Sequence, residues 1–348
     1  MLEQKKVWLN EVSFMRPILL VLLVSYHAFA PYCGAWTMPE GIKHIEFYKW
    51  VALFSRAFLL EAFVFISGYI FTFQLLTKNK FNGVWEVILN KANRLLLPCV
   101  FFGIIYYLMF RNCSQISPLQ ILTGIGHLWY LPCLFWLFII QYLIISNDIS
   151  NTNKSKYAIG GVICVLPILS VLPIPLQLNK ACYFLMFFYG GGLFYQYKDT
   201  VAKRTTAPST ILLWVVFAVM VFAVNLIMEY VQGIVSSRPS IAIKAVGSSS
   251  SLYMKIALAW VGILSLYQTA VLYCRRHRIG SFLLKVGVCG YGVYIFHQFV
   301  LIHLYRQTSL PQILGSYWLP WVSLLFAIIV SVLLTLFIRQ TRLGKKYL

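Results

Sequence analysis

Residues 13–32 read SFMRPILLVLLVSYHAFAPY, an apolar run interrupted by one arginine and one histidine. Arg16 and His27 are eleven residues apart. At about 100° per residue, a helix returns them to the same face after about three turns, separated by about 16 Å along the axis. A charged side chain and a histidine are costly in lipid, so this face is expected to contact protein or water.

Two interpretations of the pair are open at this point. Arg16 could be an anchor at the end of a helix whose side chain extends to the membrane surface, and His27 a residue that hydrogen-bonds to a neighbouring helix. Alternatively, both belong to a site inside the membrane.

The composition indicates an integral membrane protein. The 348-residue chain is 60% hydrophobic and only 11% charged, and its formal net charge is +20. The cations are scattered and no nucleic-acid-binding motif is present, so nucleic acid is not expected as a partner. The eight cysteines show no CxxC or Cys/His ligand spacing, which predicts no metal site.

The apolar runs predict an all-α polytopic fold with about ten transmembrane helices, each near the ~20 residues that a span needs. The expected spans are residues 14–31, 50–75, 95–110, 128–146, 157–174, 181–197, 210–229, 252–273, 286–305 and 317–338. Residues 230–251, which end in Gly247 and four serines, are expected to form a flexible connector. The glycines at 190–192 lie within a span and predict close helix packing.

The distribution of lysine and arginine predicts the orientation. The N-terminus, every second connection and the C-terminal tail together hold 19 of them, and the opposite connections hold 8, with Arg16 and Arg56 left out as intramembrane. Positive charge is retained in the cytoplasm, so both termini are expected there.

This orientation gives the polar residues a depth. Arg16, Lys91 and Arg94 fall at the cytoplasmic edge, where they could bind a phosphate-bearing donor, although the positive-inside rule alone explains Lys91 and Arg94. The outer half collects four of the six histidines, namely His27, His127, His297 and His303. At that depth His27 could act as a general base, whereas a lone histidine on an apolar helix, such as His297, is more often a residue of the core.

Glu61 is a carboxylate near mid-membrane, and it needs a partner. Arg56 and His27 fall at comparable depth. Glu61 could therefore orient or balance His27, or form a structural ion pair. The outer-half candidates for an acceptor site are Arg56, His127, Trp129, Tyr130 and His297, of which Trp129 and Tyr130 also fit ordinary interfacial aromatics.

Taken together, these elements resemble the acyltransferase-3 family of integral-membrane O-acyltransferases. The matching elements are, in chain order, Arg16 and His27 with ten residues between them, FVFISGY at 63–69, KANRLLLP at 91–98, HLWYL at 127–131 and YIFH at 294–297. Two departures stand out. Lys91 replaces an arginine, which gives a point charge in place of a planar fork. Pro17 follows Arg16, which predicts that Arg16 lies at a helix start.

The resemblance implies a single membrane-embedded domain over residues 1–348, without the fused SGNH-type domain of some members. It implies transfer of an acyl group, commonly acetyl from acetyl-CoA as substrate, with no bound cofactor. The acceptor would be a hydroxyl of a cell-surface glycan or its lipid-linked precursor, since the branch with an FFFISGY-like run includes sugar O-acetylases. The expected location is a bacterial inner membrane.

On this hypothesis, Arg16, Lys91 and Arg94 bind the phosphates of the donor. His27, with Arg16 and Glu61 as further catalytic candidates, acts as general base or carries the acyl group as a nucleophile. The competing class is a transporter or flippase of a lipid-linked glycan, which ten spans and buried polar groups would also suit.

Overall fold

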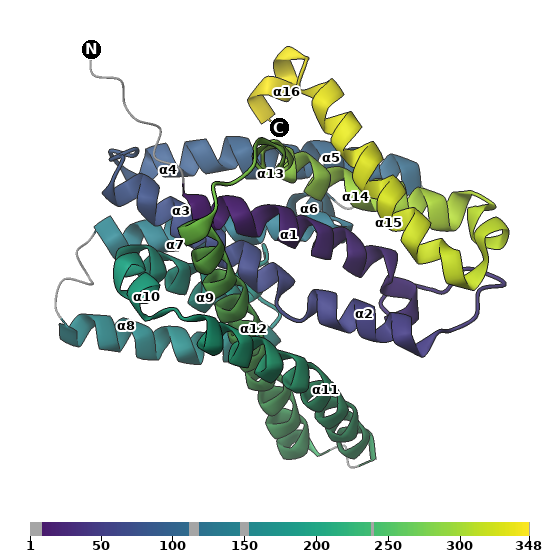
Figure 1. Cartoon of the computed structure of the whole chain (residues 1–348), viewed down its shortest axis with the longest axis horizontal. Helices are drawn as coiled ribbons and strands as arrows, with labels where there is room; N and C mark the ends of the chain where they lie inside the picture. The colour runs from purple at the N-terminus through teal and green to yellow at the C-terminus, as the bar shows by residue number, and fades with distance from the viewer. Residues whose placement is uncertain (1–8, 111–117, 147–152, 238–239, 348) are drawn as a thin grey trace.

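The computed structural model describes residues 9–110, 118–146, 153–237 and 240–347 (Figure 1). The helices of this part are α1 (Asn10–Ala28), η1 (Ala30–Cys33), α2 (Glu46–Arg56), α3 (Leu59–Leu76), α4 (Val84–Lys91), η2 (Ala92–Leu96), α5 (Leu97–Phe110), α6 (Pro118–Thr123), η4 (Gly126–Trp129), α7 (Tyr130–Ser146), α8 (Asn153–Val165), η5 (Leu166–Val171), α9 (Leu178–Gln196), α10 (Lys198–Arg204), α11 (Ala207–Ser237), α12 (Ile241–Arg276), α13 (Ser281–Val288), α14 (Gly290–Gln307), α15 (Leu310–Ile338) and α16 (Arg342–Tyr347). Four cations used in the charge count, Lys5, Lys6, Arg111 and Arg238, lie outside the described residues.

Seven helical segments of the described part are long and apolar enough to cross a membrane. They are Asn10–Ala28, Glu46–Leu76, Val84–Phe110, Gly126–Ser146, Ala207–Ser237, Ile243–Arg276 and Leu310–Ile338. The other expected spans correspond to α8 with η5, to α9 and to α14. Buried polar residues such as His297 and Gln298 make α14 less apolar than a lipid-facing helix. The predicted all-α polytopic membrane fold is confirmed.

Helix α1 lies at the centre of the arrangement (Figure 1) and packs against α2, α3, α12, α13, α14 and α15. It begins at Asn10, so Pro17 is buried in the helix interior and the expectation that Arg16 lies at a helix start is wrong. Proline is tolerated inside membrane helices because neighbouring helices hold the segment and re-satisfy the freed backbone groups.

Glycine allows α3 and α9 to approach each other closely. A Cβ at Gly68 would lie 1.9 Å from the carbonyl oxygen of Phe188, and one at Gly191 would lie 2.0 Å from that of Phe65. Gly190 and Gly192 are similarly crowded, by the side chains of other helices. The close packing predicted for residues 190–192 is therefore confirmed, and it follows from the absence of side-chain atoms at the contact.

The expected connector over residues 230–251 is wrong, because α11 runs to Ser237 and α12 begins at Ile241. The Ser240 hydroxyl accepts a hydrogen bond from the Ile243 N–H (3.2 Å) and caps α12. Ser250 donates to the Val246 carbonyl (2.8 Å), so a serine of the polar run is satisfied within the helix. The pair α11–α12 projects from the rest of the bundle (Figure 1).

Gly191→Ala tests the α3–α9 contact. The added methyl group meets backbone rather than a movable side chain, so the free energy of unfolding should fall by about 1–3 kcal/mol. Thermal unfolding in detergent measures it. The matched control is Gly160→Ala in α8, where nothing lies within 4 Å of the new Cβ. Equal stability of the two variants would contradict this account of the packing.

Candidate active site

The residues singled out from the sequence separate into three places in the structure. Arg16, Lys91 and Arg94 line one cavity. The three histidines His27, His127 and His297 form a buried cluster. Arg56 and Glu61 line a second polar cavity.

The first cavity, called here the cation cavity, has a volume of about 740 Å³. It is lined by the first half of α1, the second half of α3 and the end of α15. Its cationic lining residues are Arg16, Lys91, Arg94, Arg339 and Lys345. No aspartate or glutamate lines it among the described residues. Like charges gathered without a carboxylate repel one another, so this cavity is suited to a polyanion.

Lys91 is held at this cavity by aromatic rings. Its side chain is only 7% exposed, and its Nζ lies 3.7 Å from the ring centre of Phe138, 5.0 Å from that of Phe71 and 5.6 Å from that of Phe81. Cation–π contact stabilises an ammonium in such a setting. The lysine at this position is therefore a positioned point charge rather than a planar fork.

Arg94 lies in the short π-helix η2, which ends two residues before Pro98. Because proline has no N–H, Pro98 cannot donate to the carbonyl four residues earlier, which is that of Arg94. The Tyr291 hydroxyl donates to this carbonyl instead (2.8 Å). Tyr291 thus ties α14 to η2, and the exposed side chain of Arg94 faces the cation cavity.

The histidine cluster joins the end of α1, η4 and α14. Nδ1 of His27 lies 3.0 Å from the Leu23 carbonyl oxygen and 3.2 Å from Nε2 of His297. Nδ1 of His297 lies 2.9 Å from the Val293 carbonyl oxygen. The rings of His127 and His297 are 5.2 Å apart, centre to centre.

These contacts assign the tautomers of the neutral rings. A carbonyl only accepts, so Nδ1 of His297 donates to Val293 and its Nε2 is left as an acceptor. Nδ1 of His27 then donates to Leu23 and His297, which leaves the lone pair on Nε2 of His27. Among the described residues nothing hydrogen-bonds to that nitrogen. A free imidazole lone pair is what a general base or nucleophile requires.

The other members of the predicted acceptor set differ in their distance from this cluster. Nε2 of His127 donates to the Ile295 carbonyl (2.9 Å), and its Nδ1 is buried without a hydrogen-bond partner among the described residues. Tyr130 reaches the cluster through Tyr294, whose ring lies between them. Trp129 lies farther out, stacked on Phe184 and with Lys180 Nζ 3.8 Å from its ring centre.

His303 does not join the cluster: it is exposed and its Nδ1 pairs with Gln307 (2.7 Å). It points away because it lies six residues after His297 on α14 and so on another face of that helix.

Glu61 is not brought to His27. Its Oε1 accepts a hydrogen bond from the Tyr183 hydroxyl (2.8 Å), and both residues line a cavity of about 270 Å³ together with Arg56, Asn225 and Lys255. No cation of the described part lies within ion-pair distance of Glu61. Tyr183 could not be predicted as a site residue from the sequence, because lateral neighbours on different helices leave no local pattern.

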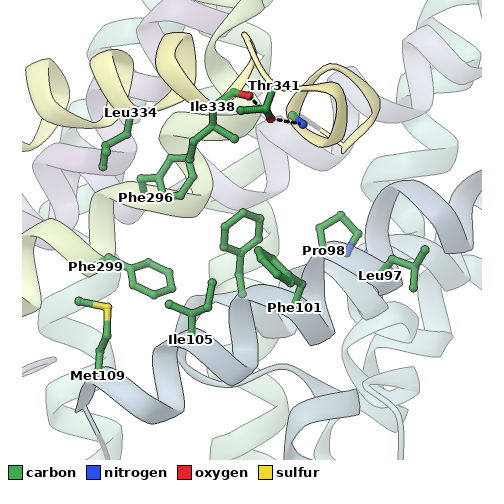
Figure 2. A pocket seen from close by; sticks show the side chains of 12 residues that line it. Leu97, Pro98, Phe101, Ile105, Met109, Phe296, Phe299, Leu334, Ile338 and Thr341 are labelled. Atoms are coloured by element: carbon green, nitrogen blue, oxygen red, sulfur yellow. Dashed lines mark hydrogen bonds between the residues drawn. The ribbon is translucent and has the colours of Figure 1, made fainter.

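Figure 2 shows the residues that line a third, apolar cavity, between α5, α14 and the α15–α16 turn. Its volume is about 650 Å³. Phe296 and Phe299 form its wall on α14, and Thr341 and Gly344 lie at its edge. Its lining is hydrocarbon apart from the Thr341 hydroxyl, so it is suited to an apolar chain rather than to a polar substrate.

Fold and site together define a polytopic membrane protein with a cationic cavity beside the first half of α1 and a buried histidine cluster at the end of that helix. Residues 9–340 match an acyltransferase domain, that of the acyltransferase 3 family. No curated protein and no solved structure matches the chain significantly. The chain belongs to the acyltransferase 3 family and is a membrane-bound acyltransferase.

His297→Ala removes the acceptor that orients His27. We expect kcat for acyl transfer to fall about tenfold, because one hydrogen bond contributes about 1.4 kcal/mol and this free energy corresponds to a factor of ten. The KM of the donor should change little. His297→Gln should keep most of the rate, because its amide oxygen can accept from Nδ1 of His27. Initial rates in membranes measure both.

The control is His303→Ala, an exposed histidine on the same helix, which should behave as the wild type. An equal loss in His297→Gln and His297→Ala, with both proteins folded, would show that acceptance of this hydrogen bond is not what His297 supplies.

Proposed function

We propose that the protein is an O-acyltransferase that moves an acetyl group from cytoplasmic acetyl-CoA to a hydroxyl of a cell-surface glycan or its lipid-linked precursor. The observation that carries this proposal is the cation cavity at Arg16 in the first half of α1, together with a histidine at the end of that helix whose Nε2 lone pair is free.

The cation cavity supports the donor assignment. Coenzyme A carries a diphosphate and a 3′-phosphate, and charge-assisted contacts to arginine and lysine are strong. Arg16, Lys91 and Arg94 meet in the cavity although they lie on different helices, and the predicted orientation places that cavity on the cytoplasmic side.

The length of α1 supports the position of the chemistry. Arg16 and His27 are separated by about 16 Å along the helix, which is close to the reach of an extended pantetheine arm. Phosphates bound near Arg16 would therefore allow the thioester to reach the level of His27, in the outer half of the membrane.

The reaction can be written with the groups present. Nε2 of His27 takes the proton of the acceptor hydroxyl as its oxygen attacks the thioester carbonyl. The new C–O bond forms, the C–S bond breaks, and the imidazolium returns the proton to the CoA thiolate. In the alternative order, Nε2 attacks the thioester first, the C–S bond breaks and CoA leaves as its thiolate. The acceptor oxygen then attacks the acyl-imidazole, the C–N bond breaks, and the hydroxyl proton passes to the thiolate.

The acceptor assignment is supported by the resemblance to sugar O-acetylases and by the second polar cavity. Arg56, Glu61, Tyr183, Asn225 and Lys255 offer hydrogen-bond donors and acceptors together, as recognition of a polyhydroxyl compound requires. We place the protein in a bacterial inner membrane on the same resemblance and on the distribution of its basic connections.

The test uses membranes that contain the protein, radiolabelled acetyl-CoA and native lipids. Wild-type protein should release CoA and transfer label to the glycolipid fraction. His27→Ala should lower that transfer at least hundredfold, because an active-site base contributes about 10²–10⁴-fold. His27→Gln, which can still hydrogen-bond, should be folded and equally inactive.

His44→Ala serves as the control, since His44 is exposed and its imidazole contacts Glu46. Full transfer by His27→Ala would overturn the mechanism. A folded wild-type protein that neither binds nor consumes acetyl-CoA would overturn the donor assignment and favour the transport of a lipid-linked glycan.

A further inference from the structure

The turn between α15 and α16 is held in one shape by three residues. The Thr341 hydroxyl donates to the Ile338 carbonyl (2.7 Å) and accepts from the Gly344 N–H (2.9 Å), as the dashed lines in Figure 2 show. A Cβ at Gly344 would lie 1.8 Å from the Ile338 carbonyl oxygen. Only glycine allows this approach, so α16 folds back against the end of α15.

This turn carries Arg339 and Lys345 to the cation cavity, where they join Arg16, Lys91 and Arg94. Nη1 of Arg339 donates to the Val288 carbonyl (3.2 Å), which fixes the side chain while its other N–H groups remain available. Lys345 is exposed and has no ion-pair partner among the described residues.

The two residues differ from Lys91 in depth. Lys91 is buried among rings, whereas Arg339 is half-buried and Lys345 is exposed. They therefore lie farther out than Lys91 and Phe138, at the same exposure as Arg16, which is half-buried, and Arg94, which is exposed. Five cations without a carboxylate exceed what a single phosphate needs, which indicates a ligand with several separated anionic groups.

We infer that Arg339 and Lys345 form a binding subsite for the 3′-phosphate of the acyl-CoA donor. This inference rests on the proposed function. The 3′-phosphate is the anionic group of coenzyme A farthest from the thioester, so it matches this pair of cations, which lie farther out than Lys91, while the diphosphate lies nearer Arg16 and Lys91.

An anionic lipid headgroup would present the same phosphate chemistry. The apolar cavity in Figure 2 borders the same turn, through Thr341 and Gly344, and could hold the acyl chain of such a lipid. The experiment must therefore separate a phosphate on the donor from a phosphate on a lipid.

The experiment compares acetyl-CoA with acetyl-3′-dephospho-CoA as donors for the full chain in vesicles. Arg339→Gln and Lys345→Gln remove one charge each, and glutamine at 339 can still donate to Val288. For each variant we expect the KM of acetyl-CoA to rise about tenfold, equivalent to about 1.4 kcal/mol per contact. The KM of acetyl-3′-dephospho-CoA should change less than about twofold, and so should kcat with either donor.

The matched control is Arg342→Gln, an exposed cation on the same turn that does not line the cavity. Its KM for both donors should equal that of the wild type. Vesicles of phosphatidylcholine alone, without anionic lipid, should give the same pattern.

An unchanged KM for acetyl-CoA in both variants would overturn the subsite. So would an equal loss for both donors, or a loss that appears only when anionic lipid is present, which would identify a lipid headgroup. A wild-type protein that does not use acetyl-CoA would instead overturn the proposed function itself.

Discussion

A polar group inside the hydrocarbon of a membrane must find its partner within the protein, and this constraint organises the bundle. His27 shows it most directly. Its Nδ1–H donates to both the Leu23 carbonyl of its own helix and Nε2 of His297. The second of these contacts requires α14 to lie against α1. The same helix then brings Tyr291 to the Arg94 carbonyl that Pro98 leaves free. One lateral arrangement thus satisfies a histidine of α1 and a backbone carbonyl of η2.

The glycine contacts between α3 and α9 help to position the aromatic rings that surround Lys91 in the cation cavity. Gly68 meets the Phe188 backbone, which fixes where the Phe188 ring lies. That ring packs against Phe71 and Phe138, and these two rings hold the ammonium of Lys91. Without the close approach of the two backbones, the aromatic wall behind Lys91 would shift and its charge would lose its fixed position.

That Arg16, Lys91 and Arg94 lie at one level along the bundle could be predicted from the sequence, whereas lateral neighbours could not. Hydropathy and the positive-inside rule place Arg16, Lys91 and Arg94 at one level, and the structure brings them into one cavity. Nothing in the local pattern indicates that Tyr183 faces Glu61, because that contact depends on which helices are adjacent. For the same reason the contact of His297 with His27 could not be predicted, because a histidine on an apolar helix can equally well be a residue of the core.

The two local errors have physical causes of the same kind. Serines and Gly247 predicted a connector, yet a serine hydroxyl within a membrane helix can return to the carbonyl one turn earlier, as Ser250 does. Pro17 predicted a helix start, yet the neighbours of α1 hold the helix on both sides of it. Helix propensities measured in water overstate the free-energy cost of placing serine, glycine or proline in a helix where no water competes for the backbone hydrogen bonds.

The arrangement along α1 also bears on what selects the acyl group. If phosphates are held near Arg16 and the acceptor base is His27, the rise per residue of the helix fixes the distance between them at about 16 Å. The pantetheine arm has one length whatever acyl group it carries, so the thioester carbonyl arrives at the same level for every donor. Selection among acyl chains must then arise beyond that level, from the residues around the histidine cluster. Trp36 is already there, its ring centre 5.6 Å from that of His27. If the acyl group is delivered to His27 as proposed, this indole would leave room for a short acyl group rather than a long one.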